Sequence, residues 1–349
     1  MTAPGPVLVM GAGAIGLWLG ARLAAAGVPV RFVGRPRVLD PLQAGGLQAT
    51  DLDGGDVQVP APALQLRHQV PGPADGPPPA LVLLCVKSGA TESAAGELAA
   101  ALPPGTPVIS MQNGLHNAEI AQAAAPALRV LAGMVPYNVA VLSPTRVHRG
   151  SGGALAVADD AVTRDWDAAF AAAGLPWVRH ADMRAVQWAK LLLNLNNPVN
   201  ALSGLPLKAQ LLDADLRRCT AALMHEAVGL LARSGVRPAR LTPLPPHAVP
   251  WLLRLPTPLF RVLAAKMLRM DDQARSSMAD DLAQGRATEV RQLCGEVVRL
   301  ALAQDRTAPL NARMITLVEQ QPARGRPWTG AALLLALRTA SHLGQPPGG

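Results

Sequence analysis

The stretch PVLVMGAGAIG, residues 6–16, joins a short apolar run to a glycine-rich turn. Four consecutive apolar residues at 7–10 predict a strand that is buried on both faces of a parallel sheet. Residues 17–26 are rich in alanine and leucine and predict a helix, and residues 28–33 predict a second strand. The pattern G-x-G-x-x-G therefore lies between a strand and a helix, which is the context that a dinucleotide-binding loop requires.

The three glycines of this loop have separate physical uses. Gly11 allows the tight turn, Gly13 lets a pyrophosphate approach the backbone, and Gly16 lets the helix pack against the sheet. Free N–H groups at the helix N-terminus attract the phosphates. We therefore predict that the whole loop binds a cofactor, through Gly11, Ala12, Gly13, Ala14, Ile15 and Gly16. A glycine-rich turn without a ligand is the alternative.

The second predicted strand is followed by Arg35, 19 residues after Gly16. An NAD-specific fold carries an acidic residue near this position, where it binds the 2′-hydroxyl of the ribose. A guanidinium suits a 2′-phosphate instead, so the sequence favours NADP(H) over NAD(H). The alternative for Arg35 is a solvated loop residue.

Two further polar residues follow predicted buried strands. Lys87 comes after the strand at residues 81–86, and Asn113 comes after the strand at residues 108–111. Ligands of open α/β sheets bind beyond the carboxyl ends of the strands. We therefore expect Lys87 to contact cofactor phosphate or ribose. We expect Asn113 to bind the cofactor and to orient a substrate against it. A surface lysine at a strand end and an Asx turn are the respective alternatives.

The chain of 349 residues suggests about two domains of ~150 residues each. Strand and helix signals alternate over residues 1–182, which predict an α/β Rossmann-type NADP-binding domain. An inserted β-hairpin is expected at residues 45–60, and a single strand at residues 130–141. Residues 183–349 predict an all-helical domain for substrate binding and catalysis, with helices at residues 211–234, 247–285, 288–304 and 330–343. We expect the tail at residues 345–349 to be disordered.

The first helix of the second domain is predicted from residue 183 to about residue 197 and carries Lys190, one of only four lysines. Around the helix axis, Asn194 lies roughly 40° from Lys190, and Asn197 lies roughly 20° on its other side. One ammonium and two amides therefore share one face of the helix, and leucines occupy the opposite face. The alternative is an ordinary amphipathic helix that ends in an Asn-Pro turn.

The composition argues against several classes of function. The net charge is +8, but the arginines are scattered singly and aromatic residues make up 3%, which disfavours nucleic-acid binding. The three cysteines form no Cys-x-x-Cys pair and the histidines lack metal-ligand spacing, so neither disulfides nor a metal site are expected. Neither a signal peptide nor an apolar run of about 18 residues is found. We expect a cytoplasmic protein without membrane contact.

Together these motifs resemble the ketopantoate reductase family, the 2-dehydropantoate 2-reductases, over essentially the whole chain. The resemblance is carried by the strand-terminal Lys87, the Asn113-Gly114 turn, the run Trp188-x-Lys190-Leu191-x-x-Asn194, and Ser276-Ser277-Met278 followed by Asp281 and Thr288-Glu289. The interval of 12 residues between Ser277 and Glu289 also matches the family's interval.

The resemblance implies a Rossmann domain and a helical domain, with catalysis in the cleft between them. It implies NADPH-dependent reduction of the ketone of 2-dehydropantoate to (R)-pantoate, a step towards pantothenate and coenzyme A. The implied roles are general acid for Lys190, binding of the adenosine phosphate for Arg35 and Lys87, and substrate contacts for Asn113, Asn194, Ser277 and Glu289. A homodimer is an expected assembly, since the helical domain often carries a dimer interface in this superfamily.

These residues can support the reaction chemically. Hydride addition to a 2-oxo acid develops negative charge on the former carbonyl oxygen, which a protonated Lys190 stabilises and then neutralises with its proton. We include Glu289 in the catalytic pair, because its carboxylate raises the pKa of a nearby lysine and can accept a hydrogen bond from a substrate hydroxyl.

One departure from the family concerns the substrate. The better-known members carry a further asparagine eight residues after the lysine, where this sequence has Pro198. The nearest replacements are Asn197, which we assign to the substrate, and Asn200. A related NADP-dependent reductase of another branched 2-oxo acid is therefore a second hypothesis, and a non-catalytic NADP-sensing protein is a third.

Overall fold

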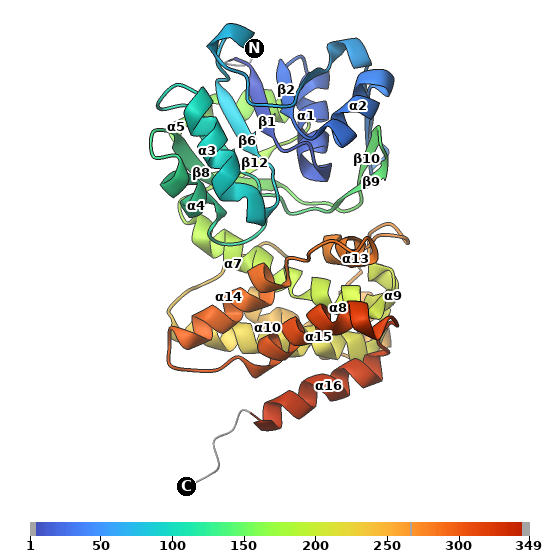
Figure 1. Ribbon diagram of the computed structural model, residues 1–349. Coiled ribbons are helices and arrows are strands. Elements are labelled where there is room, and N and C mark those ends of the chain that lie inside the picture. The colour runs from blue at the N-terminus through green and yellow to red at the C-terminus, as the bar shows by residue number, and fades with distance from the viewer. Residues whose placement is uncertain (1–4, 266, 344–349) are drawn as a thin grey trace. The chain divides into compact units, whose positions relative to one another are not determined.

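The computed structural model describes residues 5–265 and 267–343, so the tail at residues 345–349 lies outside the described residues. The chain divides into two compact units, Met1–Met183 and Arg184–Gly349 (Figure 1). Every strand of the described chain belongs to the first unit, and the second is built from helices. No helix within the described ranges is both long and apolar enough to cross a membrane.

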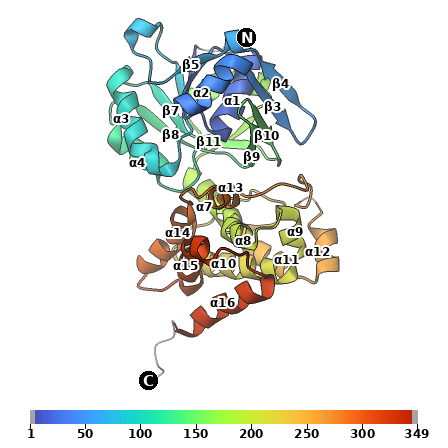
Figure 2. The same cartoon turned by 45° about the vertical axis from the view of Figure 1, so that its right-hand side comes forward.

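An eight-stranded sheet forms the centre of the first unit (Figures 1 and 2). In chain order its strands are β1 (Val7–Met10), β2 (Val30–Val33), β5 (Gln65–Arg67), β6 (Leu81–Leu84), β7 (Pro107–Ser110), β8 (Arg129–Met134), β11 (Leu155–Ala158) and β12 (Trp177–His180). Their spatial order is β12-β11-β8-β7-β6-β1-β2-β5, and every neighbouring pair is parallel except β8 and β11. The strand order reverses at β1, where open α/β sheets bind their ligands.

The central strands β1 and β6 are apolar throughout because helices cover both faces of the sheet. The helices are α1 (Ala14–Ala25), α2 (Pro36–Gly45), α3 (Thr91–Ala101), α4 (Asn117–Ala124), α5 (Ala161–Asp165) and α6 (Asp167–Ala172). Val7 and Val9 of β1 belong to the core shared with α1, α2 and α6. Leu8 and Met10 point the other way, into the core shared with α3 and α4. The predicted Rossmann-type unit, followed by a helical unit, is confirmed.

A second sheet of four strands contains β3 (Leu47–Asp51), β4 (Asp56–Val59), β9 (Val139–Ser143) and β10 (Arg146–Arg149). β3 and β4 are antiparallel neighbours, so the hairpin predicted at residues 45–60 is confirmed. The prediction of one strand over residues 130–141 is wrong, because β8 and β9 belong to different sheets. Pro136 lies between them, and it has no backbone N–H with which to extend a ladder.

The second unit is organised around its longest helix. The helices are α7 (Met183–Asn194), α8 (Asn196–Ser203), α9 (Leu207–Leu212), α10 (Ala214–Arg233), α11 (Val249–Arg254), α12 (Thr257–Leu263), α13 (Ser277–Ala283), α14 (Val290–Leu302), α15 (Pro309–Arg324) and α16 (Gly330–Leu343). α10 contacts α8, α9, α11, α14, α15 and α16, so it is the central element of this unit (Figure 2).

The helix predicted from residue 183 to about 197 is in fact two helices. α7 ends at Asn194 and α8 begins at Asn196. Pro198 has no N–H to donate to the carbonyl of Asn194, four residues before it, and its ring would collide with that carbonyl. Asn194 still lies one turn from Lys190 on α7, but the expected separation of roughly 20° between Lys190 and Asn197 does not hold.

Two other predicted helices are also divided. The helix expected at residues 211–234 breaks at Asp213, whose carboxylate caps α10 by accepting hydrogen bonds of 2.9 Å from the N–H groups of Asp215 and Leu216. The helix expected at residues 247–285 is divided into α11, α12 and α13, and Pro256 lies directly before α12. Proline and an N-cap side chain thus set boundaries that apolar periodicity alone does not show.

Candidate functional site

The glycine loop between β1 and α1 combines a closed turn with open backbone. Gly11 has a φ of 108°, and a Cβ there would lie 2.7 Å from the backbone nitrogen of Val86. A Cβ on the buried Gly16 would collide with the carbonyl oxygen of Gly11. Gly13 is exposed, and a Cβ there would meet no other described residue within 4 Å beyond its chain neighbours. Gly11 and Gly16 therefore close the turn, while Gly13 leaves space over the backbone.

The start of α1 suits an anion. Gly13 is its N-cap residue, and no side chain of the described chain caps this end. The first turn of α1 also contains no acidic residue. The unpaired N–H groups and the positive end of the helix dipole are therefore directed at the space above Gly13, which fits a pyrophosphate.

Four neighbouring strands deliver the predicted cofactor residues to one edge of the sheet. In spatial order these strands are β2, β1, β6 and β7, and each pair is parallel. Arg35 follows β2, the glycine loop follows β1, Lys87 follows β6 and Asn113 follows β7. Both Arg35 and Lys87 are exposed, and Asn113 is half-buried. The first unit thus brings all its predicted site residues to the carboxyl edge of the sheet, as expected for a dinucleotide fold.

A buried polar network, which the sequence did not reveal, fixes the loops that carry Lys87 and Asn113. The Gln112 amide donates to the carbonyl of Val86 at 2.9 Å and to the hydroxyl of Thr91 at 2.7 Å. Thr91 in turn donates to Asn117 at 3.0 Å, and the Asn117 amide donates to the carbonyl of Asn113. The only sequence signal for this network was the polar pair Gln112-Asn113 directly after a buried strand.

In the second unit, Lys190 and Asn194 lie one turn apart on α7. Lys190 is half-buried, and burial lowers the pKa of its ammonium from 10.5 to about 8. The cause is desolvation, which disfavours the charged form. Asn194 is buried, with 8% of its surface exposed. A lysine with such a pKa exchanges its proton readily near neutral pH, as a general acid must.

The remaining predicted residues lie at the ends of other helices in this unit. Asn197 is half-buried in the first turn of α8, and Ser277 is exposed at the first position of α13. Glu289 is half-buried and is the N-cap residue of α14. Asn200 is fully buried, and its side chain accepts a hydrogen bond from the backbone N–H of Ser276, directly before α13. The predicted site residues of this unit are thus concentrated at helix termini and on α7.

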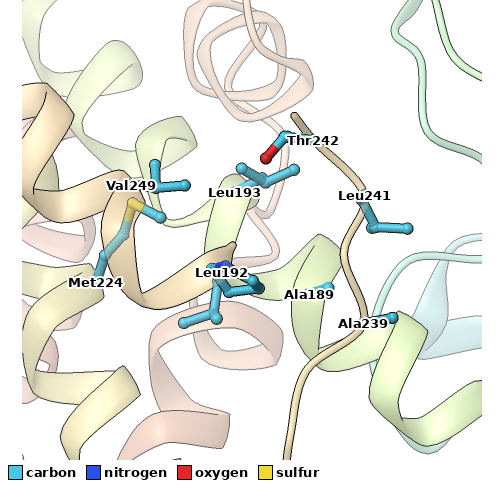
Figure 3. Close-up of a pocket in the computed structure, with 9 residues that line it drawn as sticks. Ala189, Leu192, Leu193, Met224, Ala239, Leu241, Thr242 and Val249 are labelled. Carbon is cyan, nitrogen blue, oxygen red and sulfur yellow. The ribbon is translucent and has the colours of Figure 1, made fainter. Parts of the chain in front are cut away.

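A small pocket in the second unit lies against a different part of α7. Ala189, Leu192 and Leu193 line it from α7, together with Met224 and Val249 (Figure 3). Its other lining residues come from the segment before α11, and they are Ala239, Leu241, Thr242 and Pro246. None of the predicted site residues lines this pocket. Its lining has no charged group, so it does not suit a carboxylate ligand.

Comparisons with known proteins cover both units. The family model described as Ketopantoate reductase PanE/ApbA matches residues 7–160, and the model described as Ketopantoate reductase PanE/ApbA C terminal matches residues 182–321. A 2-dehydropantoate 2-reductase from Halobacterium salinarum is 29% identical over 319 residues, which cover 89% of this chain and 97% of the relative.

Solved structures of similar fold cover nearly the whole chain as well. A PanE/ApbA family ketopantoate reductase from Ralstonia eutropha has a TM-score of 0.74 and 28% identity, with 97% of this chain and 100% of that chain covered. D-Mandelate dehydrogenase with NADH and anilino(oxo)acetate has a TM-score of 0.74 at 17% identity, covering 90% of this chain and 98% of that chain, and shares the fold. Because the two family models together span most of the chain, the resemblance found in its motifs is confirmed, and this protein belongs to the ketopantoate reductase family.

Proposed function

We propose that this protein catalyses the NADPH-dependent reduction of 2-dehydropantoate to (R)-pantoate. Relatives that are similar over most of the chain are named 2-dehydropantoate 2-reductases, which supports the substrate and the reaction type. The observation that carries the proposal is Lys190, whose pKa burial lowers to about 8, one turn from the buried amide of Asn194. An acid and a hydrogen-bond donor on one helical face suit a carbonyl that becomes an alkoxide.

The first unit, residues 1–182, would hold the cofactor. The open backbone at Gly13 fits the pyrophosphate, and the exposed guanidinium of Arg35 fits a 2′-phosphate beside it. Lys87 would add a second positive charge, while Asn113 would face the substrate from the end of β7. NADPH, when bound, supplies the hydride.

The second unit, residues 183–349, would hold the substrate and the proton. Lys190 stabilises the growing negative charge on the substrate oxygen and then transfers its proton from Nζ to that oxygen. Asn194, Asn197 and Ser277 would donate hydrogen bonds to the substrate. Glu289 would accept one from a substrate hydroxyl and support the charged form of the lysine.

The cellular setting is part of the same proposal. The three cysteines, Cys85, Cys219 and Cys294, are free thiols, as suits a reducing compartment such as the cytoplasm. We propose a homodimer with a small 2-oxo acid as the ligand, and neither nucleic acid nor membrane as a partner.

A second candidate substrate is another branched 2-oxo acid. Pro198 stands where better-known family members have a substrate asparagine, and it breaks the helix between Asn194 and Asn196. The similar fold of D-mandelate dehydrogenase, solved with NADH and anilino(oxo)acetate, indicates that this architecture accepts other 2-oxo acids.

The test is NADPH oxidation by wild type and Lys190→Ala against a panel of 2-oxo acids. We expect 2-dehydropantoate to be the best substrate, and Lys190→Ala to reduce kcat by about 10²- to 10⁴-fold while NADPH still binds. If 2-oxoisovalerate is reduced as well as 2-dehydropantoate, the second candidate replaces the first. A wild type that binds NADPH but reduces nothing would favour a sensing protein.

A further inference from the structure

The side chain of Asn200 joins two helices of the second unit, α8 and α13. Its Oδ1 accepts a hydrogen bond of 3.0 Å from the backbone N–H of Ser276, directly before α13. Its Nδ2 donates a hydrogen bond of 2.8 Å to the carbonyl of Leu205. The residue is fully buried, with 0% of its surface exposed, so its amide cannot reach a substrate. Asn200 therefore has a role inside the protein.

Ser276 joins the same helices through its hydroxyl. Its Oγ accepts a hydrogen bond of 3.2 Å from the N–H of Ala279, which is the N-cap bond of α13. The same Oγ donates to the carbonyl of Asn197 at 3.4 Å. Ser276 is fully buried, whereas Ser277 directly after it is exposed. The start of α13 is thus held by Asn200 on one side and by the backbone of Asn197 on the other.

The three asparagines of α8 differ in what their amides contact. The amides of Asn196 and Gln210 are paired by hydrogen bonds of 3.3 and 2.6 Å, and Asn196 also accepts one from Thr220 at 3.1 Å. Asn200 is bonded at both ends, as above. Asn197 is half-buried, and its side-chain amide makes no hydrogen bond within residues 5–265 and 267–343. Of these three side chains, Asn197 is the one that can donate to a ligand.

We propose that Asn200 is a positioning residue for substrate binding. It holds the start of α13 against α8, so that the Ser277 hydroxyl and the Asn197 amide are fixed as two donors for the carboxylate of a 2-oxo acid. Asn197 then replaces the family's further substrate asparagine. Fixed donors bind a carboxylate more tightly than mobile ones, because less conformational freedom is lost on binding. This inference rests on the proposed function, since it requires a carboxylate substrate.

The first experiment compares Asn200→Ala with Asn196→Ala as a matched control. Both substitutions remove a hydrogen-bonded amide from α8, so both should lower the urea midpoint of unfolding. Asn200→Ala alone should raise the KM for the 2-oxo acid, by about tenfold, which is the order expected for one misplaced hydrogen bond to a charged group. The kcat should stay within about twofold, because Lys190 is unchanged.

The second experiment asks whether Asn200 acts through Ser277. In the Ser277→Ala background, the effect of Asn200→Ala on KM should largely disappear. Of the two donors, only Ser277 lies on α13, the helix that Asn200 holds against α8, and that donor is then already missing. Hydrogen exchange at the amides of residues 277–279 should become faster in Asn200→Ala and stay unchanged in Asn196→Ala.

The outcomes separate the two proposals. Equal KM changes in Asn200→Ala and Asn196→Ala, or additive effects with Ser277→Ala, would overturn the positioning role, since a general loss of stability would then explain the data. An active wild type with unchanged KM in Asn200→Ala refutes the positioning role alone. A wild type that reduces no 2-oxo acid removes the proposed function, and the positioning role with it.

Discussion

Replacing Lys190 with methionine should stabilise the fold while it removes activity. Methionine is unbranched and apolar, so it can occupy the space of the lysine stem without a charge. In the folded protein, burial lowers the pKa of Lys190 from 10.5 to about 8. The folded state therefore disfavours the ammonium relative to the unfolded chain, and wild type carries this destabilisation at neutral pH.

The magnitude follows from the two pKa values. A difference of about 2.5 pH units corresponds to about 3 kcal/mol of unfolding free energy. Lys190 is half-buried, so solvent screens part of this, and we expect Lys190→Met to gain about 1 to 3 kcal/mol at pH 7. The full effect is present below a pH of about 8, where both states hold the proton. It decreases between about 8 and 10.5, because there only the unfolded chain keeps the proton.

Urea unfolding at about pH 7 and about pH 10 measures this difference. The control is Lys208→Met, which removes an exposed ion pair of 2.7 Å with Asp272 and should change the unfolding free energy by less than about 1 kcal/mol. If Lys190→Met is less stable than wild type at neutral pH, or if its gain does not shrink at high pH, then the lysine is not held in a desolvated site and the reasoning fails.

Three further outcomes are expected. Because the proton donor is lost as Lys190 deprotonates, kcat/KM for reduction should be flat at low pH and fall above a pH of about 8. The kcat/KM for the reverse oxidation should rise in the same range. A flat profile in steady-state assays would contradict the assignment of Lys190 as the general acid. Arg35→Ala should raise the KM for NADPH by about 10- to 100-fold and leave the KM for NADH nearly unchanged, since only the 2′-phosphate contact is removed; equal losses for both cofactors would exclude that contact. Gly13→Val should weaken NADPH binding at least about tenfold in a fluorescence titration without changing the urea midpoint of unfolding. Gly16→Ala should instead destabilise the fold by about 1 to 3 kcal/mol, because its Cβ collides with the carbonyl oxygen of Gly11. The reverse pattern would refute the separate roles given to these two glycines.

Local sequence patterns were enough to predict where the proposed cofactor residues lie in the sheet. The glycine loop and the polar residues after the buried strands are recognised from residues within a few positions of one another. A parallel sheet then places the carboxyl ends of its strands on one edge. That is why Arg35, Lys87 and Asn113 could be assigned to neighbouring strand ends before the structure was known.

The parts that could not be predicted depend on contacts between distant residues. The Asn200–Ser276 hydrogen bond joins residues 76 positions apart, and no pattern around either residue indicates the other. The pairing of β3 with β10 also joins segments far apart in the chain. The continuous helix predicted from residue 183 to about 197 was wrong for a different reason. The break between α7 and α8 has a local cause, Pro198, and the effect of a proline inside a helix can be predicted from the sequence alone.

The break between α7 and α8 also has an evolutionary consequence. In a continuous helix, the loss of one residue turns every later side chain by about 100°. Leu195, the junction residue, separates α7 from α8, so a deletion here can be absorbed by a change in the joint. The segment that carries Lys190 and the segment that carries Asn197 and Asn200 can then change their relative rotation without unwinding either helix.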